Sequence, residues 1–393
     1  MRTTTAPETR TNGAAQVLAM SLELGATEWK MAFSPGLGQQ PRHRVVVAGD
    51  LEAVKKEIAA AKARFRLPAD VRVVSCYEAG RDGFWIHRAL EMLGVKNYVV
   101  DSSAIEVNRR ARRAKTDRLD AAKLVSLLLR YVSGEKHVWK VVRVPTEEEE
   151  DRRHLHRELK TVKDACTAVT SRIKGLLATV GVRLAEIADL PRLLERVRLW
   201  NGSPLPKWLK ARLERDWKER EQLRQRIAEL EKQRKELMRK AEDSGSQCAR
   251  KLNQLRGMGP NASWLYALEF FAWREFKNRR QIGALAGLTP TPYQSGADRR
   301  EQGISKAGNR WMRSVAIEIA WGWLRYQPDS DLSRWYRERY ASGSTRQRKI
   351  GIVALARKLL IELWKYLQTG TPPAGAVLKK QAQPRAAVAR PLG

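Results

Sequence analysis

The sequence predicts an α/β domain with a mixed sheet, followed by long coiled-coil helices and an all-α C-terminal domain. Between residues 15 and 144, β-branched segments and amphipathic helical segments alternate in an α/β order. Between residues 145 and 243, apolar residues recur at alternating spacings of four and three, which is typical of a coiled coil. Between residues 244 and 370, helical segments are separated by turns that contain glycine and proline. We expect residues 1–14 to be disordered and residues 371–393 to form a disordered basic tail.

In the first domain, short apolar runs bounded by turn residues predict strands, and a 3.6-residue period predicts helices. The run V-L-A-M-S-L-E-L after Gln16 is followed by Gly25, as expected for a strand and a tight turn. The expected order is strands at 17–24, 29–33 and 44–48, a helix at 50–66, a strand at 71–76, a helix at 82–93, a strand at 95–100, and a helix that begins near Asp117.

Four acidic residues occupy distinctive positions in this pattern. Asp117 and Asp120 lie three residues apart, so on a helix their side chains leave from one face and can share a divalent cation. Glu23 lies at the end of the first strand and Glu78 lies just past the fourth. Carboxylates at adjacent strand ends and on one helix face are how an RNase H-like sheet holds two metal ions, about 3.5–4 Å apart. The alternatives are a solvent-facing Glu23 and an Asp120 that is favoured by the helix dipole.

The charge of the chain points to a polyanionic partner. Seventy-five lysine and arginine residues against 43 aspartate and glutamate residues give a formal net charge of +32, which is too large for an ordinary metabolic enzyme. The candidate phosphate contacts are Arg109, Arg110, Arg112, Arg113, Lys115, Arg118, Arg299, Arg300, Lys306 and Arg310. No apolar run approaches the length of a membrane-spanning helix, and three widely spaced cysteines favour a reducing, cytoplasmic setting.

Two seams define the coiled-coil region. The first runs from Leu155 to Val180, and the second resumes from Leu223 to Leu237 after a break at 191–206. The two helices can pair within one chain or between chains, and we favour a role in assembly. His154 and His156 match no ligand pattern, so both are predicted to be surface residues.

In the C-terminal domain, residues 244–246 are predicted to be a linker, and Gly257 and Gly259 a turn whose backbone N–H groups can approach a phosphate. A final basic helix is expected at 346–366. Residues 287–296 are predicted to be a loop stiffened by two prolines, with Ser295 exposed in a basic setting.

Ser295 is the candidate nucleophile of this loop. No histidine follows His156, so a Ser-His-Asp hydrolase is a poor interpretation. Attack on a phosphodiester remains open, because arginines and metal ions can stabilise charge on phosphorus while positioning supplies much of the rate. A serine that only contacts phosphate is equally compatible with these residues.

Six motifs in order resemble the one-ten family of bacterial insertion-sequence transposases, the bridge-RNA-guided serine recombinases. They span most of residues 16–368. The motifs are C-Y-E-A-G at 76–80, A-K-T-D-R-L-D-A at 114–121, G-M-G-P at 257–260, A-G-L-T-P-T-P-Y-Q-S-G at 286–296, G-I-S-K-A-G-N at 303–309 and V-A-L-A-R-K-L-L at 353–360.

The resemblance implies a RuvC-like N-terminal domain whose D-E-D-D acids bind Mg²⁺, with two ions possible, and a helical domain whose serine joins covalently to DNA. By position, Glu78, Asp117 and Asp120 take the second to fourth acid roles and Ser295 takes the nucleophile's. Glu23 stands where the family has aspartate, and its extra methylene displaces the carboxylate by about 1.5 Å.

The resemblance also implies partners. They are a structured RNA that pairs with donor and target DNA, and further copies of the chain in a homo-tetramer, a dimer of dimers joined by the coiled coil. The sequence therefore predicts an Mg²⁺-dependent DNA transposase acting through a 5′-phosphoserine intermediate. Two alternatives stay open: a metal-dependent nuclease or junction resolvase that uses water, and a catalytically impaired nucleic-acid-binding protein.

Overall fold

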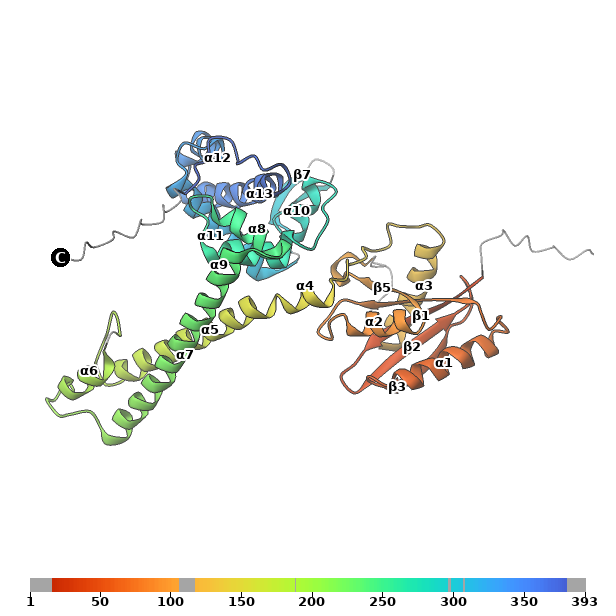
Figure 1. The fold of residues 1–393 in the computed structure, drawn as a ribbon, viewed down its shortest axis with the longest axis horizontal. Coiled ribbons are helices and arrows are strands. Elements are labelled where there is room, and N and C mark those ends of the chain that lie inside the picture. The colour runs from red at the N-terminus through yellow and green to blue at the C-terminus, as the bar shows by residue number, and fades with distance from the viewer. Residues whose placement is uncertain (1–15, 106–116, 188, 296–297, 307, 380–393) are drawn as a thin grey trace, which may run out of the picture. The chain divides into compact units, whose positions relative to one another are not determined.

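The computed structural model describes residues 16–105, 117–187, 189–295, 298–306 and 308–379. The chain divides into two compact units, Met1–Pro145 and Thr146–Gly393 (Figure 1). The boundary follows Pro145, where the sequence leaves its α/β pattern. None of the helices in the described part of the chain combines the length and apolar composition that crossing a membrane requires.

The first unit is built on a five-stranded sheet with the strand order β3-β2-β1-β4-β5. β1 pairs with β2 and β2 pairs with β3 in antiparallel fashion, whereas β4 and β5 extend the sheet parallel to β1. The strands are β1 (Val17–Leu24), β2 (Glu28–Ser34), β3 (Arg42–Val47), β4 (Arg72–Glu78) and β5 (Lys96–Val100). Each strand expected from the sequence is present, with ends shifted by a few residues.

Helices cover both faces of this sheet. α1 (Leu51–Arg64) and α2 (Trp85–Met92) share one apolar core with Leu18, Met20 and Leu22 of β1. α3 (Asp117–Val132) covers the other face, where it packs against Ala19 of β1. This division follows from the alternation of side chains along β1, because successive residues point to opposite faces of a sheet.

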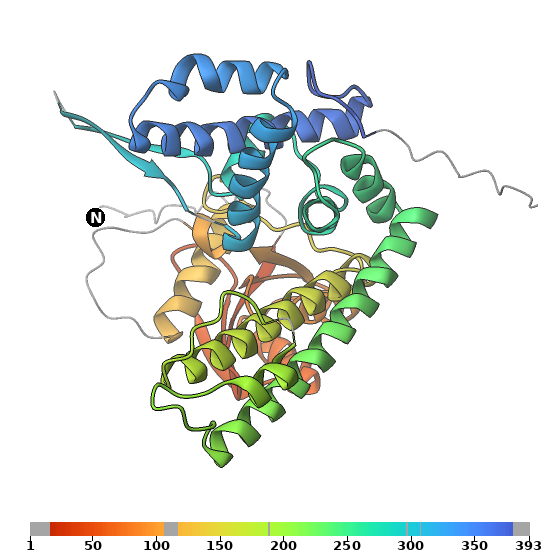
Figure 2. The same cartoon turned by 90° about the vertical axis from the view of Figure 1, so that its left-hand side faces the viewer.

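The second unit begins with a short helix, α4 (Glu147–Asp151), and two long helices, α5 (His154–Ala178) and α7 (Lys207–Lys240). α5 and α7 lie side by side and antiparallel within one chain (Figures 1 and 2). Apolar residues of the predicted seams meet between them, and ion pairs such as Lys163–Glu231, 2.6 Å between Nζ and Oε1, flank the contact. α6 (Leu190–Arg196) occupies the expected break. Pairing between chains stays a prediction.

The remaining helices form an apolar core around α11 and α13, in which Trp323 and Leu363 are fully buried. A π-helical turn follows α9, and another follows α12. The elements are α8 (Ser244–Asn253), α9 (Pro260–Tyr266), the π-helix η2 (Ala267–Phe271), α10 (Arg279–Leu285), α11 (Arg310–Tyr326), α12 (Asp331–Tyr336), the π-helix η3 (Arg337–Ala341) and α13 (Thr345–Thr369).

The prediction of an all-α C-terminal domain is wrong at one place. The segment expected to be a loop forms an antiparallel ribbon of β6 (Pro290–Ser295) and β7 (Asp298–Ile304). Two prolines led us to expect a loop, but a two-stranded ribbon consists of edge strands only. An edge strand tolerates a residue that lacks an N–H group.

The predicted linker at 244–246 is also wrong, because these residues begin α8. The carboxylate of Asp243 accepts hydrogen bonds from the backbone N–H groups of Gly245 (2.9 Å) and Ser246 (3.0 Å), which caps the helix. The Gly-Ser composition is thus explained by capping and close packing, since Gly245 and Ser246 are both buried.

The predicted disorder from residue 371 is wrong for residues 371–379. The side chain of Gln327 donates to the backbone oxygen of Val377 (2.8 Å) and accepts from its N–H (2.8 Å). Lys379 donates from Nζ to the backbone oxygen of Met258 (2.7 Å). Residues 380–393 lie outside the described part of the chain.

Candidate functional site

Glu23 and Glu78 follow equivalent positions on two neighbouring parallel strands. Leu22 of β1 pairs with Tyr77 of β4, and each glutamate is the next residue. Both strands run in the same direction, so both carboxylates lie at the carboxyl end of the sheet. This edge is where sites form in sheets with parallel strands.

The two glutamates also face the same side of the sheet. Ser21 and Cys76, two residues earlier, both bond to α3: Ser21 Oγ donates to the backbone oxygen of Ala121 (2.6 Å), and Cys76 Sγ lies 3.8 Å from that of Leu124. Because strand side chains alternate, the carboxylates two residues on share this face. The pKa of the Cys76 thiol agrees, since burial raises it and the charge of Glu78 raises it further.

α3 places the two aspartates over the same face. It begins at Asp117, and Asp120 immediately precedes the residue that accepts the Ser21 bond. Asp120 is half-buried. Only the backbone of Asp117 is described. Both aspartates therefore belong to the helix that covers the face shared by the two glutamates.

The chemistry of this acidic set suits a hard cation. Carboxylate oxygens are the ligands that Mg²⁺ prefers, and four acids supply them from three elements. Lys30 of β2 pairs with Glu23, so an ammonium group lies on the strand beside the first acid. Among the side chains that the structure describes, no three acidic, histidine or cysteine groups are close enough together to hold a metal ion. The three described acids are therefore gathered on one face without a closed ligand set.

Most of the predicted basic contacts cannot be placed in the site. Arg118 belongs to α3, but its side chain is not described. The others of the first group, Arg109, Arg110, Arg112, Arg113 and Lys115, lie outside the described residues.

Ser295 is the last residue of β6, beside the tip of the ribbon. It pairs with Asp298, while Gln294 and Tyr293 pair with Arg299 and Arg300. The side chains of these ribbon residues are not described, so the backbone alone places the two arginines opposite the strand end that carries Ser295.

The other two basic candidates lie beyond the ribbon. Lys306 is exposed, has a left-handed backbone (φ 54°), and its N–H donates to the carbonyl of Gly287 (3.2 Å). Arg310 is exposed at the start of α11, after Asn309, which caps that helix. Both positions are accessible to a phosphate backbone.

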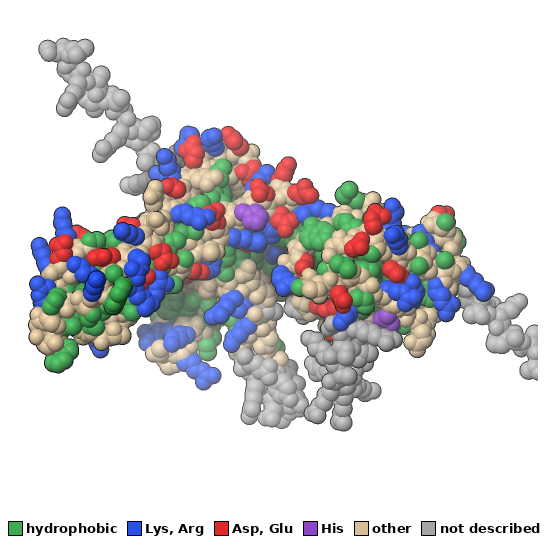
Figure 3. Space-filling model, turned by 90° about the horizontal axis from the view of Figure 1, so that it is seen from below, with side chains coloured by type: hydrophobic (Ala, Val, Ile, Leu, Met, Phe, Trp, Pro, Cys, Tyr) green, Lys and Arg blue, Asp and Glu red, His purple; other side chains and the backbone are tan. Residues whose placement is uncertain are grey.

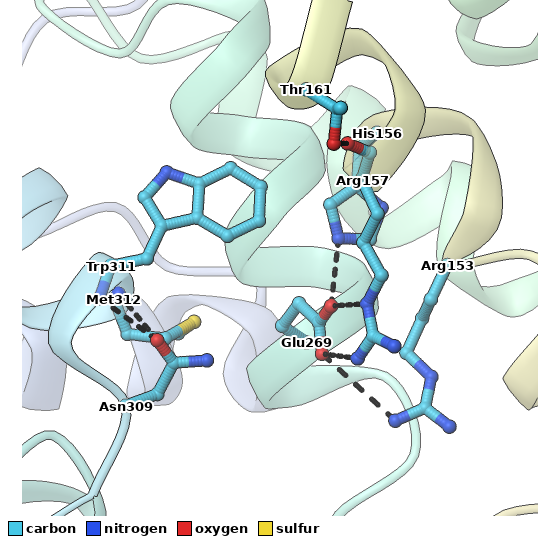
Figure 4. A network of polar contacts seen from close by, with 8 residues as sticks. All are labelled: Arg153, His156, Arg157, Thr161, Glu269, Asn309, Trp311 and Met312. Atoms are coloured by element: carbon cyan, nitrogen blue, oxygen red, sulfur yellow. Dashed lines mark hydrogen bonds and ion pairs between the residues drawn. The ribbon is translucent and has the colours of Figure 1, made fainter. Parts of the chain in front are cut away.

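A buried charge cluster around Glu269 was not predicted (Figure 4). Glu269 Oε1 lies 2.9 Å from His156 Nε2 and 2.7 Å from Arg157 Nε. Arg153 Nη1 lies 3.9 Å from Oε2, and the ring of Trp311 stacks on that of His156, 5.6 Å between centroids. The prediction that His156 is a surface residue is therefore wrong. The sequence did contain a signal of a buried charge, because Glu269 is the one acidic residue in the apolar run L-Y-A-L-E-F-F.

The role of this cluster is to hold helices together, and it does not supply a reactive group. Burial alone would raise the pKa of Glu269, but hydrogen bonds from His156 and Arg157 outweigh it and lower the pKa to about 2. A carboxylate that is ionised throughout the physiological range is a poor general acid or base. Glu269 instead joins η2 to the first turn of α5.

Comparisons with known proteins identify relatives of this chain. Residues 249–335 match the profile of the Transposase IS116/IS110/IS902 family. The chain is 41% identical to "Putative transposase y4rJ" of Sinorhizobium fredii, over 92% of this chain and 94% of that protein. It is 28% identical to "Probable family 20 transposase" of Pseudomonas aeruginosa, over 61% of this chain and 75% of that protein.

A third relative comes from Yersinia enterocolitica. The chain is 26% identical to its "Transposase for insertion sequence element IS1328", over 58% of this chain and 65% of that protein. The similarity to the Sinorhizobium protein extends through both units, beyond the profile match in the second. The chain belongs to the IS110/IS116 family of insertion-sequence transposases.

Proposed function

We propose that this transposase cuts and rejoins DNA through a covalent 5′-phosphoserine intermediate on Ser295. The hydroxyl oxygen of Ser295 attacks phosphorus, the bond to the 3′ oxygen breaks, and a free 3′-hydroxyl leaves. A DNA end later attacks the phosphoserine and restores Ser295. The linkage conserves the energy of the phosphodiester, so no nucleotide hydrolysis is needed.

The observation that carries the proposal is that Glu23 and Glu78 end neighbouring parallel strands, on the face of the sheet that α3, which carries Asp117 and Asp120, covers. The strand order, with three antiparallel strands and two parallel ones, is compatible with an RNase H-like, RuvC-like domain. In that domain, Glu23, Glu78, Asp117 and Asp120 would hold Mg²⁺. When bound, Mg²⁺ stabilises negative charge on the scissile phosphate. The acids orient the ion, and Ser295 supplies the bond-forming oxygen.

Substrate selection is proposed to rest on RNA. A structured RNA from the same element would pair with donor and target DNA, and the protein would hold the shape and backbone of the duplexes. The net charge of +32 supports a large polyanionic partner. A homo-tetramer, in which the serine of one subunit meets the acids of another, would join the two sites. The helices α5 and α7 are the elements proposed to bring the protomers together.

The test is Ser295→Ala in RNA-bound protein with a DNA substrate. We expect no covalent protein–DNA adduct on a denaturing gel and no recombined product. Ser305→Ala is the matched control, because Ser305 is an exposed serine just beyond the same ribbon. DNA cutting by Ser295→Ala without an adduct would show that water is the nucleophile. The absence of a discrete RNA in the purified protein would argue against RNA guidance.

A catalytically impaired protein is the second candidate, favoured by Glu23 and by the cross-strand position of Lys30. The longer side chain places its carboxylate differently from an aspartate, and metal sites tolerate errors of about 0.2 Å. Wild-type protein that binds DNA without cutting it, together with cutting by Glu23→Asp, would establish this candidate. Equal cutting by both proteins would exclude it.

A further inference from the structure

Two tryptophans stand in solvent at the end of the α5–α7 helix pair that carries α6. Trp200 is 88% exposed and Trp208 is 78% exposed. Trp200 is the second residue of a turn at 199–202. A 2.9 Å hydrogen bond from the N–H of Gly202 to the carbonyl of Leu199 closes this turn. Trp208 lies in the first turn of α7. Exposed apolar surface rimmed by polar residues is typical of interaction sites.

The segment that carries the two exposed tryptophans is well packed and hydrogen-bonded. Leu190, Leu194, Leu205 and Leu213 are buried in one core beneath them, and Leu199 packs against it. A further backbone hydrogen bond, 2.8 Å from the N–H of Leu199 to the carbonyl of Ser203, fixes the turn. The leucines point inward and the tryptophans point outward from the same short stretch.

The segment that carries the two rings is rich in basic residues. Residues 190–212 contain six lysine or arginine residues and one acidic residue. Arg192 pairs with Asp189, and Lys207 lies with Nζ 5.8 Å from the ring centre of Trp208. Figure 3 shows lysine and arginine side chains among hydrophobic and acidic ones at its left-hand end, where α6 lies in Figure 1.

We propose that Trp200 and Trp208 form a stacking site for unpaired bases of single-stranded DNA, with Lys207 and its basic neighbours contacting the phosphates. Base–aromatic stacking beside a positive surface is the general chemistry of single-strand binding. The substrate of a transposase is DNA, and cutting and exchanging strands exposes unpaired ends. A second copy of this tip is a poor occupant, because two such surfaces would bring like charges together. The site uses none of the residues proposed for the chemistry, so it does not depend on the phosphoserine mechanism.

The test measures binding of a labelled oligothymidylate of about 16 nucleotides to full-length protein by fluorescence anisotropy at fixed ionic strength. Trp200→Ala with Trp208→Ala is expected to weaken binding by about tenfold or more. The double phenylalanine variant is expected to retain most of the affinity, whereas the double leucine variant keeps apolar surface without a π-face and binds as weakly as the alanine variant. Trp321→Ala, at a half-exposed tryptophan of α11, is the control.

Several results would overturn the proposal. They are unchanged affinity in the double alanine variant, full affinity in the leucine variant, a larger loss for oligouridylate or duplex DNA than for oligothymidylate, or a change confined to the oligomeric state. Photo-crosslinking of an iododeoxyuridine oligonucleotide gives a direct readout. We expect adducts on the peptides that carry Trp200 or Trp208, and adducts only elsewhere would contradict the site.

Discussion

His156 Nε2 lies 2.9 Å from Glu269 Oε1, and this contact joins two residues 113 positions apart in the chain. His156 is on the first turn of α5, and Glu269 is in the π-helical turn η2. Both are at least nine-tenths buried. The pair therefore anchors the long helices to the C-terminal helices through a buried charge, and any motion of α5 at this end must break it.

Replacing Glu269 by glutamine should destabilise the second unit. The change leaves Arg153 and Arg157 without their shared anion, and Arg153 is almost completely buried. Breaking a buried pair costs about 3–5 kcal/mol, and the partial exposure of Arg157 reduces the expected loss to about 2–4 kcal/mol. Urea unfolding measures it. Glu362→Gln, which breaks the more exposed pair with Lys365, should cost less than about 1 kcal/mol. Equal losses in the two variants would contradict the anchoring role.

The same carboxylate predicts a pH dependence of stability. The pKa of Glu269 is lowered from 4.5 to about 2 in the folded protein. The folded state therefore favours the ionised form, so its stabilisation is complete above about pH 4.5 and is lost as the pH falls toward 2. The loss amounts to about 3 kcal/mol. The difference in unfolding free energy between wild type and Glu269→Gln should shrink over this range. A difference that stays constant with pH would show that folding does not lower the pKa of Glu269.

The sheet and its helices were predictable because their signals are local. Alternation along β1 and the 3.6-residue period of α3 depend on neighbours in the sequence. The positions of Glu23, Glu78 and Asp120 on those elements followed directly. The pairing of β1 with β4, which brings the two glutamates to one edge, is set by long-range packing and was expected only from the order of elements.

The failures share a physical cause. His156 is polar by composition, and its burial depends on Glu269, which no local pattern connects to it. Residues 371–379 have the composition of a disordered segment, yet the amide of Gln327 bonds both backbone groups of Val377, and the N–H of Lys379 donates to the carbonyl of Gln254. In both cases a tertiary hydrogen bond compensates the cost of ordering or burying groups that would otherwise stay in water.

Replacing Glu78 by glutamine should abolish cutting while leaving the fold intact. The amide keeps the shape of the side chain but removes the charge that would attract a metal ion. Outer-shell changes at metal sites already cost 10- to 100-fold, so we expect a loss of about 100-fold or more in the rate of DNA cleavage. Glu28→Gln, at an exposed acid on β2, should cut at the wild-type rate. A Glu78→Gln variant that cuts normally would remove the second acid from the proposed site.

Replacing Gly245 by alanine should destabilise the start of α8. A methyl group there would lie 2.5 Å from Cδ2 of Leu268 and 3.0 Å from Oδ1 of Asp243, so both the core and the helix cap must shift. Overpacking of this kind costs about 1–3 kcal/mol. Gly175→Ala, in the last turn of α5 with open space around it, should instead stabilise the protein by about 0.5–1 kcal/mol. Thermal unfolding followed by circular dichroism compares the two. The same sign of change in both would contradict the packing at Gly245.

Two truncations of the C-terminus should differ in stability, because residues 371–379 bond to the second unit. A chain that ends after Gly370 loses the bonds between Gln327 and Val377 and the bond from Lys379 to Met258, and it leaves the buried amide of Gln327 without these partners. At about 1 kcal/mol for each hydrogen bond, the expected loss in unfolding free energy is about 2–4 kcal/mol. A chain that ends after Lys379 keeps all three bonds and should unfold at the wild-type urea concentration. Gln327→Ala in the full chain should reproduce part of the loss seen in the shorter truncation, because it removes both bonds to Val377 but keeps the bond from Lys379 to Met258. If the two truncations were equally stable, residues 371–379 would contribute nothing to the folded state.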